Sequence, residues 1–139
     1  MTSDVAHLIK VASNEISRGI NTFAGKYGLT GTQIQIIYYL ANSHDNVYQR
    51  DIEKEFNIRR STATNILKTM EKNNLIWRKS VKSDSRLKRI ILSDKAKEMQ
   101  DAIGKFMDEN NQKILSTLGT IERHSFVRAL KKIPQKLKK

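Results

Sequence analysis

The sequence predicts a mostly α-helical protein with one small β-hairpin. Apolar residues recur at steps of three and four along most of the chain, and the single proline, Pro134, comes almost at the end, so long helices are allowed before it. Residues 75–92 contain short runs typical of strands. With 139 residues, the chain is long enough for one domain with its own core. It contains no cysteine, which excludes disulfides, thiolate metal sites and thiol redox switches.

A long helix is expected first, with Ser3 as its N-cap and Asp4 in its first turn. Its apolar residues form one narrow stripe about 30 Å long. The stripe consists of Val5, Leu8, Ile9, Ala12, Ile16, Ile20 and Phe23. Gly25 and Gly28 bracket the end of the helix. Because the rest of this small chain cannot cover such a stripe, a second subunit is its expected partner.

A second helix is expected to start at Thr30. Thr30 and Gln33 have the spacing of a capping box, and the helical pattern continues to Ala41. A polar break follows at residues 42–46. A short third helix is then expected from about Gln49 to Phe56.

Two asparagines are expected to make sharp turns around a further short helix over Ser61–Asn73. Asn57 precedes this helix and Asn74 follows it. Asparagine adopts the left-handed backbone conformation more readily than any residue except glycine, so both positions suit a chain reversal.

Two short antiparallel strands are expected next, at Leu75–Lys79 and Leu87–Leu92, with Ser80–Arg86 as a protruding basic loop. Ser93 is a candidate N-cap for a long helix that continues past Leu118 to a break near Gly119. A final helix is expected to carry Ile121, Phe126, Leu130 and Ile133.

The positive charge is concentrated in the middle of the chain. The net charge is +12, and residues 46–92 hold twelve basic and five acidic residues, whereas residues 1–45 are neutral. Such a block indicates a polyanionic partner. Because no apolar run approaches the roughly 20 residues of a membrane span and no signal-peptide pattern opens the chain, a soluble, cytoplasmic protein is expected.

Two short helices with a tight turn, followed by a basic hairpin, occur in the order of a winged helix-turn-helix. At these residues the chain resembles the MarR family of bacterial regulators. The most specific motif is Asp84-Ser85-Arg86 before an apolar strand ending Ile91-Leu92-Ser93. Similar proteins carry Asp-x-Arg in the hairpin, or wing. The resemblance covers roughly residues 30–100 by motif and the flanking helices by arrangement.

The resemblance implies one MarR-type domain over residues 1–139. Within it, a winged helix-turn-helix lobe at residues 30–92 would bind DNA, and residues 1–28 and 93–139 would form dimerisation helices. A two-fold interface would then interleave both ends of the chain. The residues expected in this interface are Val5, Leu8, Ile9, Phe126, Leu130, Ile133 and Leu137.

The chain departs from the family pattern at helix ends. Asn57 and Asn74 stand where similar proteins often have glycine, and Tyr48 replaces a common threonine cap. Arg59 occupies the usual Ser or Thr cap position of the recognition helix. That cap is therefore expected to shift to Ser61 or to be weaker.

The candidate DNA contacts lie on the recognition helix and the hairpin. A recognition helix enters the major groove with its N-terminal residues, and an arginine on the hairpin suits a narrow minor groove. The candidates are Arg59, Arg60, Ser61, Thr62, Thr64, Asn65, Lys68, Lys79, Lys82, Asp84, Arg86 and Lys88. The resemblance implies that Asp84 orients Arg86 by an ion pair. The alternatives are a solvated helix face and an ordinary exposed ion pair.

Similar proteins often bind small lipophilic or phenolic effectors between the dimer helices and the DNA-binding lobe. The candidate lining residues here are Ile16, Ile20, Phe23, Tyr38 and Trp77, and ordinary core packing is the alternative. The three histidines show no metal-ligand spacing, and the sequence contains no catalytic or phosphate-binding motif. We therefore expect no metal, no cofactor and no enzymatic activity.

The sequence thus predicts a homodimeric, sequence-specific regulator of transcription that binds double-stranded DNA at a pseudo-palindromic operator, as a ligand-responsive repressor. One alternative is an architectural nucleic-acid-binding protein with little sequence preference. Another is an interaction module whose basic surface meets an acidic protein. The first predicts a steep preference for one operator, the second little preference, and the third no DNA binding at physiological salt.

Overall fold

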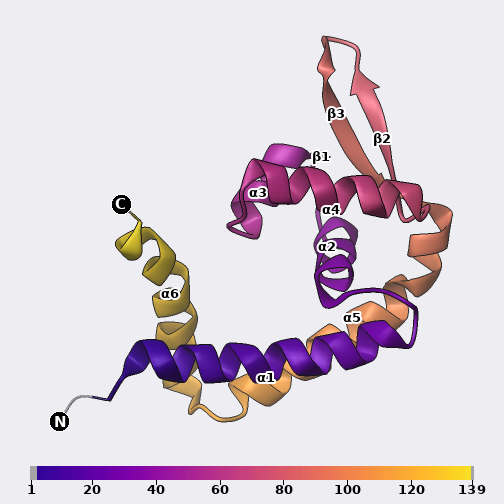
Figure 1. Ribbon diagram of the computed structural model, residues 1–139. Coiled ribbons are helices and arrows are strands. Elements are labelled where there is room, and N and C mark those ends of the chain that lie inside the picture. Colours follow the sequence, from indigo (N-terminus) through magenta and orange to yellow (C-terminus); the bar gives the residue numbers. More distant parts are fainter. Residues whose placement is uncertain (1–2, 139) are drawn as a thin grey trace. The chain divides into compact units, whose positions relative to one another are not determined.

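The computed structural model describes residues 3–138, without the side chains of residues 84–86. The elements are α1 (Val5–Gly25), α2 (Gly31–Ala41), β1 (Val47–Tyr48), α3 (Gln49–Glu55), α4 (Arg60–Lys72), β2 (Ile76–Val81), β3 (Asp84–Leu92), α5 (Asp94–Leu115) and α6 (Thr120–Leu137) (Figure 1). The described residues form two compact units, one ending at Gly104 and the other beginning at Lys105. The mostly helical fold class with a small antiparallel wing is confirmed.

Helix α1 begins one residue later than expected. The N-cap is Asp4 and not Ser3, because the Asp4 carboxylate accepts a hydrogen bond of 3.1 Å from the backbone N–H of His7. The helix ends at Gly25, and Gly28 has a φ of 70°, a left-handed conformation that glycine adopts without strain.

The start of α2 is fixed by two sets of hydrogen bonds. The predicted capping box is confirmed: the Gln33 N–H donates to the Thr30 hydroxyl at 3.2 Å, and the Gln33 side-chain oxygen accepts from the Thr30 N–H at 3.0 Å. In addition, the Asn21 side chain of α1 accepts from the Gly31 N–H at 3.0 Å. These bonds satisfy N–H groups that a helix start would otherwise leave unpaired.

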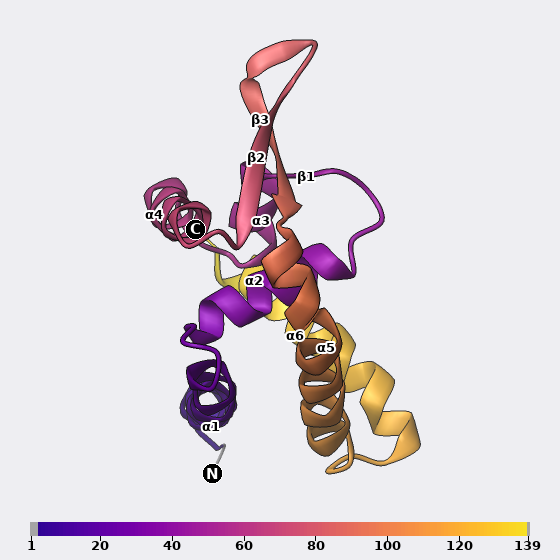
Figure 2. The same cartoon turned by 90° about the vertical axis from the view of Figure 1, so that its right-hand side faces the viewer.

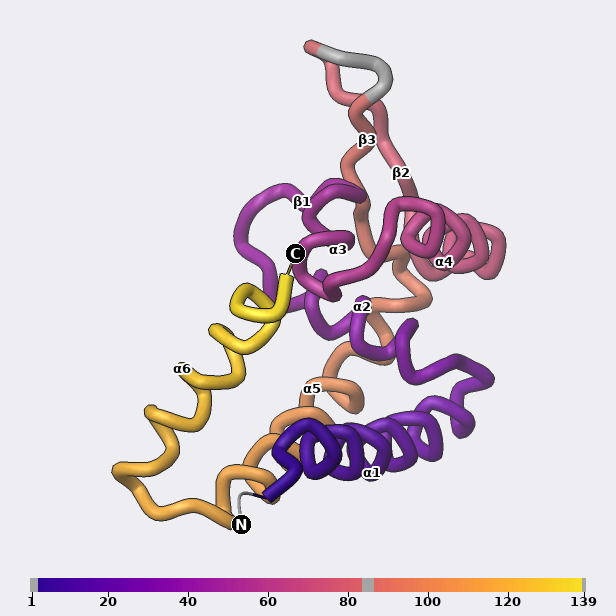
Figure 3. The backbone as a smooth tube through the Cα atoms, turned by 60° about the vertical axis from the view of Figure 1, so that its left-hand side comes forward, coloured from indigo at the N-terminus to yellow at the C-terminus, as the bar shows by residue number. Residues whose placement is uncertain are grey.

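Helices α3 and α4 form the expected helix-turn-helix pair, side by side and joined by a tight turn (Figure 3). Asn57 and Asn74 have φ values of 51° and 61°, as predicted. Arg59 is the N-cap of α4, but its side chain makes no capping hydrogen bond. Of the two expectations for this cap, a weaker cap is therefore correct, and a shift of the cap to Ser61 is wrong.

The sheet has three strands in the order β1-β3-β2, and the sequence reasoning missed β1. The hairpin also differs from the expectation. Strands β2 and β3 continue to Val81 and Asp84, which pair across a turn at residues 82–83, so the predicted loop over Ser80–Arg86 is wrong. The backbone of residues 84–86 belongs to β3 instead. The two strands project as a ribbon away from α4 (Figures 1 and 2).

The core of the first unit lies between the helices and one face of the sheet. Its buried side chains include Ile20, Ile34, Ile36, Ile37, Ile52, Leu67, Met70, Leu75, Ile76 and Ile103. Ser93 caps the start of α5 as predicted, because its hydroxyl accepts from the Ala96 N–H at 3.1 Å. The same hydroxyl also donates to the Asn74 carbonyl, which was not predicted. This joint fixes the base of the hairpin to the core.

The second unit contains the end of α5 and α6. Helix α5 ends at Leu115, so the expectation that it continues past Leu118 is wrong. The predicted break near Gly119 is confirmed, and the Gly119 N–H donates to the Glu122 carboxylate at 2.7 Å at the start of α6. Within the described residues, no helix is both long and apolar enough to cross a bilayer.

Candidate nucleic-acid interface

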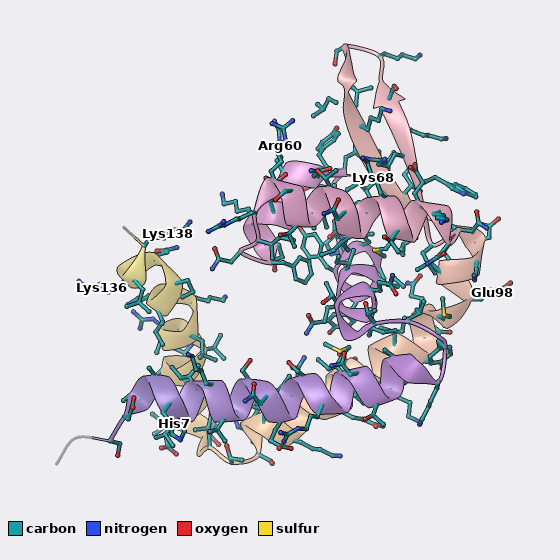
Figure 4. The ribbon with its side chains drawn as sticks, in the orientation of Figure 1. His7, Arg60, Lys68, Glu98, Lys136 and Lys138 are labelled. Atoms are coloured by element: carbon teal, nitrogen blue, oxygen red, sulfur yellow. The ribbon has the colours of Figure 1, made fainter. Side chains whose placement is uncertain are left out.

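Helix α4 presents a polar and basic face opposite its buried one. Ala63, Leu67 and Met70 are buried against the lobe. The predicted contact residues on the other side are exposed: Arg59, Arg60, Ser61, Thr62, Asn65 and Lys68. Figure 4 shows the side chains of Arg60 and Lys68 on the side of α4 from which the hairpin projects. The exposed face and the hairpin therefore point the same way.

Thr64 differs from the other candidates because its hydroxyl already has partners inside the lobe. It is half-buried, donates to the Arg60 carbonyl at 2.9 Å and accepts from the Gln49 side-chain amide at 2.9 Å. Thr64 thereby joins the first turn of α4 to the start of α3. The sequence reasoning missed Gln49, since nothing in the sequence signals a partner fifteen residues away.

The hairpin carries the other predicted basic residues. Lys79, Lys82 and Lys88 are exposed, with Lys82 in the tight turn. The side chains of Asp84 and Arg86 lie outside the described residues, so their ion pair stays a prediction.

A cavity of about 350 Å³ lies between α3, α4 and the base of the hairpin. Its lining residues are Tyr48, Gln49, Arg50, Glu53, Arg60, Thr64, Arg78, Leu87, Lys88 and Ile90. Four of them are basic and one is acidic, which makes this hollow attractive to anions. Arg50 and Arg78 were not among the predicted residues, although both lie in the basic block of the sequence. The Arg50 guanidinium lies 5.6 Å from the centre of the Tyr48 ring, a cation–π contact.

An ion pair connects the end of α4 to β2. The Arg78 guanidinium donates to both carboxylate oxygens of Glu71, at 3.0 and 3.3 Å. These hydrogen bonds lower the pKa of Glu71, even though partial burial acts in the opposite direction. The sequence reasoning missed this pair because the two residues belong to different elements.

The candidate effector-binding residues lie on three elements. Ile16, Ile20 and Phe23 are on α1, Tyr38 is on α2 and Trp77 is on β2. Ile20 is already buried in the core, whereas Trp77 is 47% exposed. The cavity described above is lined by other residues, and so is a second one of about 280 Å³ beside the α2–β1 loop. The effector site stays a prediction.

The candidate dimer residues form apolar surfaces on both units. On α1, Val5 and Leu8 are 57% and 56% exposed, and Ile9 is also exposed. On α6, Leu130 and Leu137 are exposed, and Phe126 and Ile133 are half-buried. Apolar side chains that gather on one exposed face of a helix are candidates for a protein–protein contact. Among the side chains that the structure describes, no cluster of three or more His, Asp or Glu residues is arranged to hold a metal ion.

Comparison with known proteins assigns the fold to a family. A model described as MarR family matches residues 27–87. The crystal structure of the transcription regulator MarR from Oenococcus oeni PSU-1 is 41% identical, with a TM-score of 0.87, over 95% of this chain and 99% of that chain. No curated protein matches the chain.

Two structures of S. aureus MepR are also similar. One, in a DNA-binding conformation, is 26% identical with a TM-score of 0.89, over 98% of this chain and all of that chain. The other, a MepR–DNA complex, is 25% identical with a TM-score of 0.86, over 99% of this chain and all of that chain. The match to a family of regulators also confirms the expectation that the chain is not an enzyme. With 41% identity over nearly the whole of both chains, this protein belongs to the MarR family of winged helix-turn-helix transcription regulators.

Proposed function

We propose that this chain forms a homodimer that binds double-stranded DNA at a pseudo-palindromic operator and represses transcription until an effector releases it. The proposal places the protein in the cytoplasm, with the DNA of a bacterial cell. The observation that best supports this proposal is that the exposed face of α4 and the basic hairpin point in the same direction. A helix and a hairpin so placed can enter a major groove and the adjacent minor groove together.

A similar protein supports this mode of binding. The S. aureus MepR structure with a TM-score of 0.86 to this chain is a complex with DNA. In a two-fold dimer, the two copies of α4 would have to lie about 34 Å apart, one helical turn of DNA, to enter successive major grooves. A pseudo-palindromic site follows from that symmetry.

DNA binding can be tested by fluorescence anisotropy on two labelled duplexes of equal length and base composition. One carries the pseudo-palindrome upstream of the protein's own gene and the other a scrambled sequence. We expect the palindrome to bind at least about 10³-fold tighter at physiological salt, with two chains per duplex. Equal affinities that fall together with salt would instead identify an architectural binder. No binding to either duplex would point to an acidic protein as the partner.

The effector part of the proposal is supported by the aromatic side chains of Phe23 and Tyr38, half-buried on the packed pair α1 and α2. Titrating the operator complex with salicylate, as a phenolic anion, should release the DNA. Small-angle scattering should then show a changed separation of the two DNA-binding lobes. Unchanged operator affinity at millimolar salicylate would exclude phenolic anions as effectors.

A further inference from the structure

The Glu71–Arg78 ion pair lies where the hairpin leaves the lobe. Arg78 is opposite Ile90 on β3, and Ile90 is opposite Val47 on β1, so the sheet is three strands wide at this level. One step further, Tyr48 still pairs with Arg89. Beyond that level, the hairpin consists of two strands.

A two-stranded ribbon is only marginally stable by itself in water. The direction in which this hairpin projects is therefore determined by contacts at its base. On the β2 side, these contacts are the buried Leu75 and Ile76 and the bond from Arg78 to α4. The ion pair is thus a direct polar connection between α4 and the strand that carries the hairpin.

Arg78 needs a counter-charge at this place. It lines the basic cavity together with Arg60 and Lys88, and its side chain is only 21% exposed. Like charges near a partly buried guanidinium are unfavourable unless an acid offsets them. Glu71 offsets them with both carboxylate oxygens, which also fixes the plane of the guanidinium.

We propose that Glu71 is a positioning residue for the hairpin: by holding Arg78, it fixes the hairpin to α4 so that both meet DNA as one rigid unit. This inference rests on the proposed function and deepens it. It gives a role in DNA binding to an acidic residue that need not touch DNA.

For Glu71→Gln, a positioning role and a simple net-charge argument predict opposite changes in DNA affinity. Glu71→Gln adds one positive charge to a basic protein, which by itself would tighten binding to DNA. If Glu71 positions the hairpin, the same change should weaken operator binding by about three- to tenfold and leave binding to scrambled DNA nearly unchanged. Glu98→Gln is the matched control, since Glu98 is exposed on α5 and the charge change is the same (Figure 4). Its operator affinity should be unchanged or slightly higher.

Rescue by charge reversal separates positioning from charge. The double variant Glu71→Arg with Arg78→Glu has the net charge of the native protein and can form the same pair in reverse. We expect it to bind the operator within about threefold of the native protein. Either single variant of this couple should bind several times more weakly.

Trp77 provides a readout in the protein without DNA. It is the only tryptophan, it precedes Arg78 on β2, and it is 47% exposed. In Glu71→Gln, we expect faster nanosecond motion of Trp77 by anisotropy decay, and the charge-reversed pair should restore the native motion. A residue that only adds to global stability would lower the unfolding midpoint without changing this motion.

Two results would overturn the inference: operator binding by Glu71→Gln as tight as by Glu98→Gln, or unchanged motion of Trp77 in the Glu71→Gln variant. Failure of the proposed function is a different outcome, because the native protein would then bind neither duplex. The Trp77 measurement would still decide whether Glu71 holds the hairpin.

Discussion

At the hairpin, a single acid, Asp84, stands among basic residues of a segment expected to face DNA. Simple electrostatics predicts that Asp84→Ala tightens binding, whereas a carboxylate that orients Arg86 predicts a loss. We expect weaker binding to the operator and little change on scrambled DNA. Anisotropy titrations of both duplexes at two salt concentrations measure this. Tighter operator binding would leave the hairpin as a plain basic patch.

Arg86 itself should behave as a direct contact. For Arg86→Ala we expect a loss of about 1–3 kcal/mol in operator binding. The slope of log affinity against log salt should decrease by about one, because one fewer counterion is released. Loss of affinity with an unchanged slope would argue against a phosphate or groove contact.

Glu71 should give stability a specific pH dependence. Its pKa lies below the ordinary value of 4.5 in the folded protein because Arg78 hydrogen-bonds the carboxylate. Because the pKa is lower in the folded protein, the pair contributes its full stabilisation at pH values above the unfolded-state pKa of Glu71. This stabilisation is lost as the pH falls through the folded-state pKa. Since the side chain is 40% exposed, solvent screening keeps the contribution below about 1 kcal/mol.

Urea unfolding of the native protein and Glu71→Gln between pH 7 and pH 3 tests this. The difference in free energy of unfolding should be constant above about pH 5 and should shrink below it. Glu98→Gln serves again as the control. A difference that is the same at every pH would mean that the carboxylate charge does not matter for stability.

At the scale of the elements, the recognition helix α4 depends on Thr64 because Arg59 does not cap it. Thr64→Val removes the hydroxyl that Gln49 and the Arg60 carbonyl share. We expect the free energy of unfolding to fall by about 0.5–1.5 kcal/mol and hydrogen exchange in the first turn of α4 to become faster. Thr69→Val is the control, because the Thr69 hydroxyl donates to the Asn65 carbonyl of its own helix. Equal effects of both substitutions would remove the link to α3 as the cause.

The contact between α1 and α2 depends on a glycine. A Cβ atom at Gly31 would overlap the Asn21 side-chain oxygen that accepts the Gly31 N–H. Gly31→Ala must therefore displace the Asn21 side chain and break that hydrogen bond, which should lower the free energy of unfolding by about 1 kcal/mol. Gly25→Ala, where a Cβ meets nothing within 4 Å, should be neutral or slightly stabilising. Thermal unfolding compares the two, and a Gly31→Ala variant as stable as Gly25→Ala would contradict the argument.

The sequence is informative about elements where a local pattern is long. The helices, the capping box of Thr30 and the left-handed Asn57 each follow from residues close together in the chain. Strand β1 is two residues long and has no periodicity, so only its pairing with Arg89 and Ile90 of β3 defines it. The length of the hairpin likewise depends on cross-strand bonds near its turn, which no single-strand pattern contains.

The same limit applies to the candidate site. The exposed residues of α4 and the lysines of the hairpin could be found from charge and from their place in the motif. Gln49 and Glu71 could not be found, because their hydrogen-bond partners, Thr64 and Arg78, are brought near them only by folding. An acid in a basic block reads as a solvated charge until its partner is known.

The whole molecule is expected to be a dimer, because α1 leaves an apolar stripe exposed. Leu8 is 56% exposed on this stripe, and burying such side chains in an interface yields roughly 25 cal/mol per Å² of apolar surface removed from water. Leu8→Glu would place a charge in that interface and should give monomers in light scattering at micromolar concentration.

Asn14→Glu is the matched control, since Asn14 is an exposed polar residue of α1 on the side away from the stripe. A monomeric native protein would refute the dimer, and so would a Leu8→Glu variant that stays dimeric and binds the operator as tightly as Asn14→Glu. If only the interface is lost, Leu8→Glu should keep its helical circular dichroism and lose operator affinity, because one lobe alone contacts a single half-site.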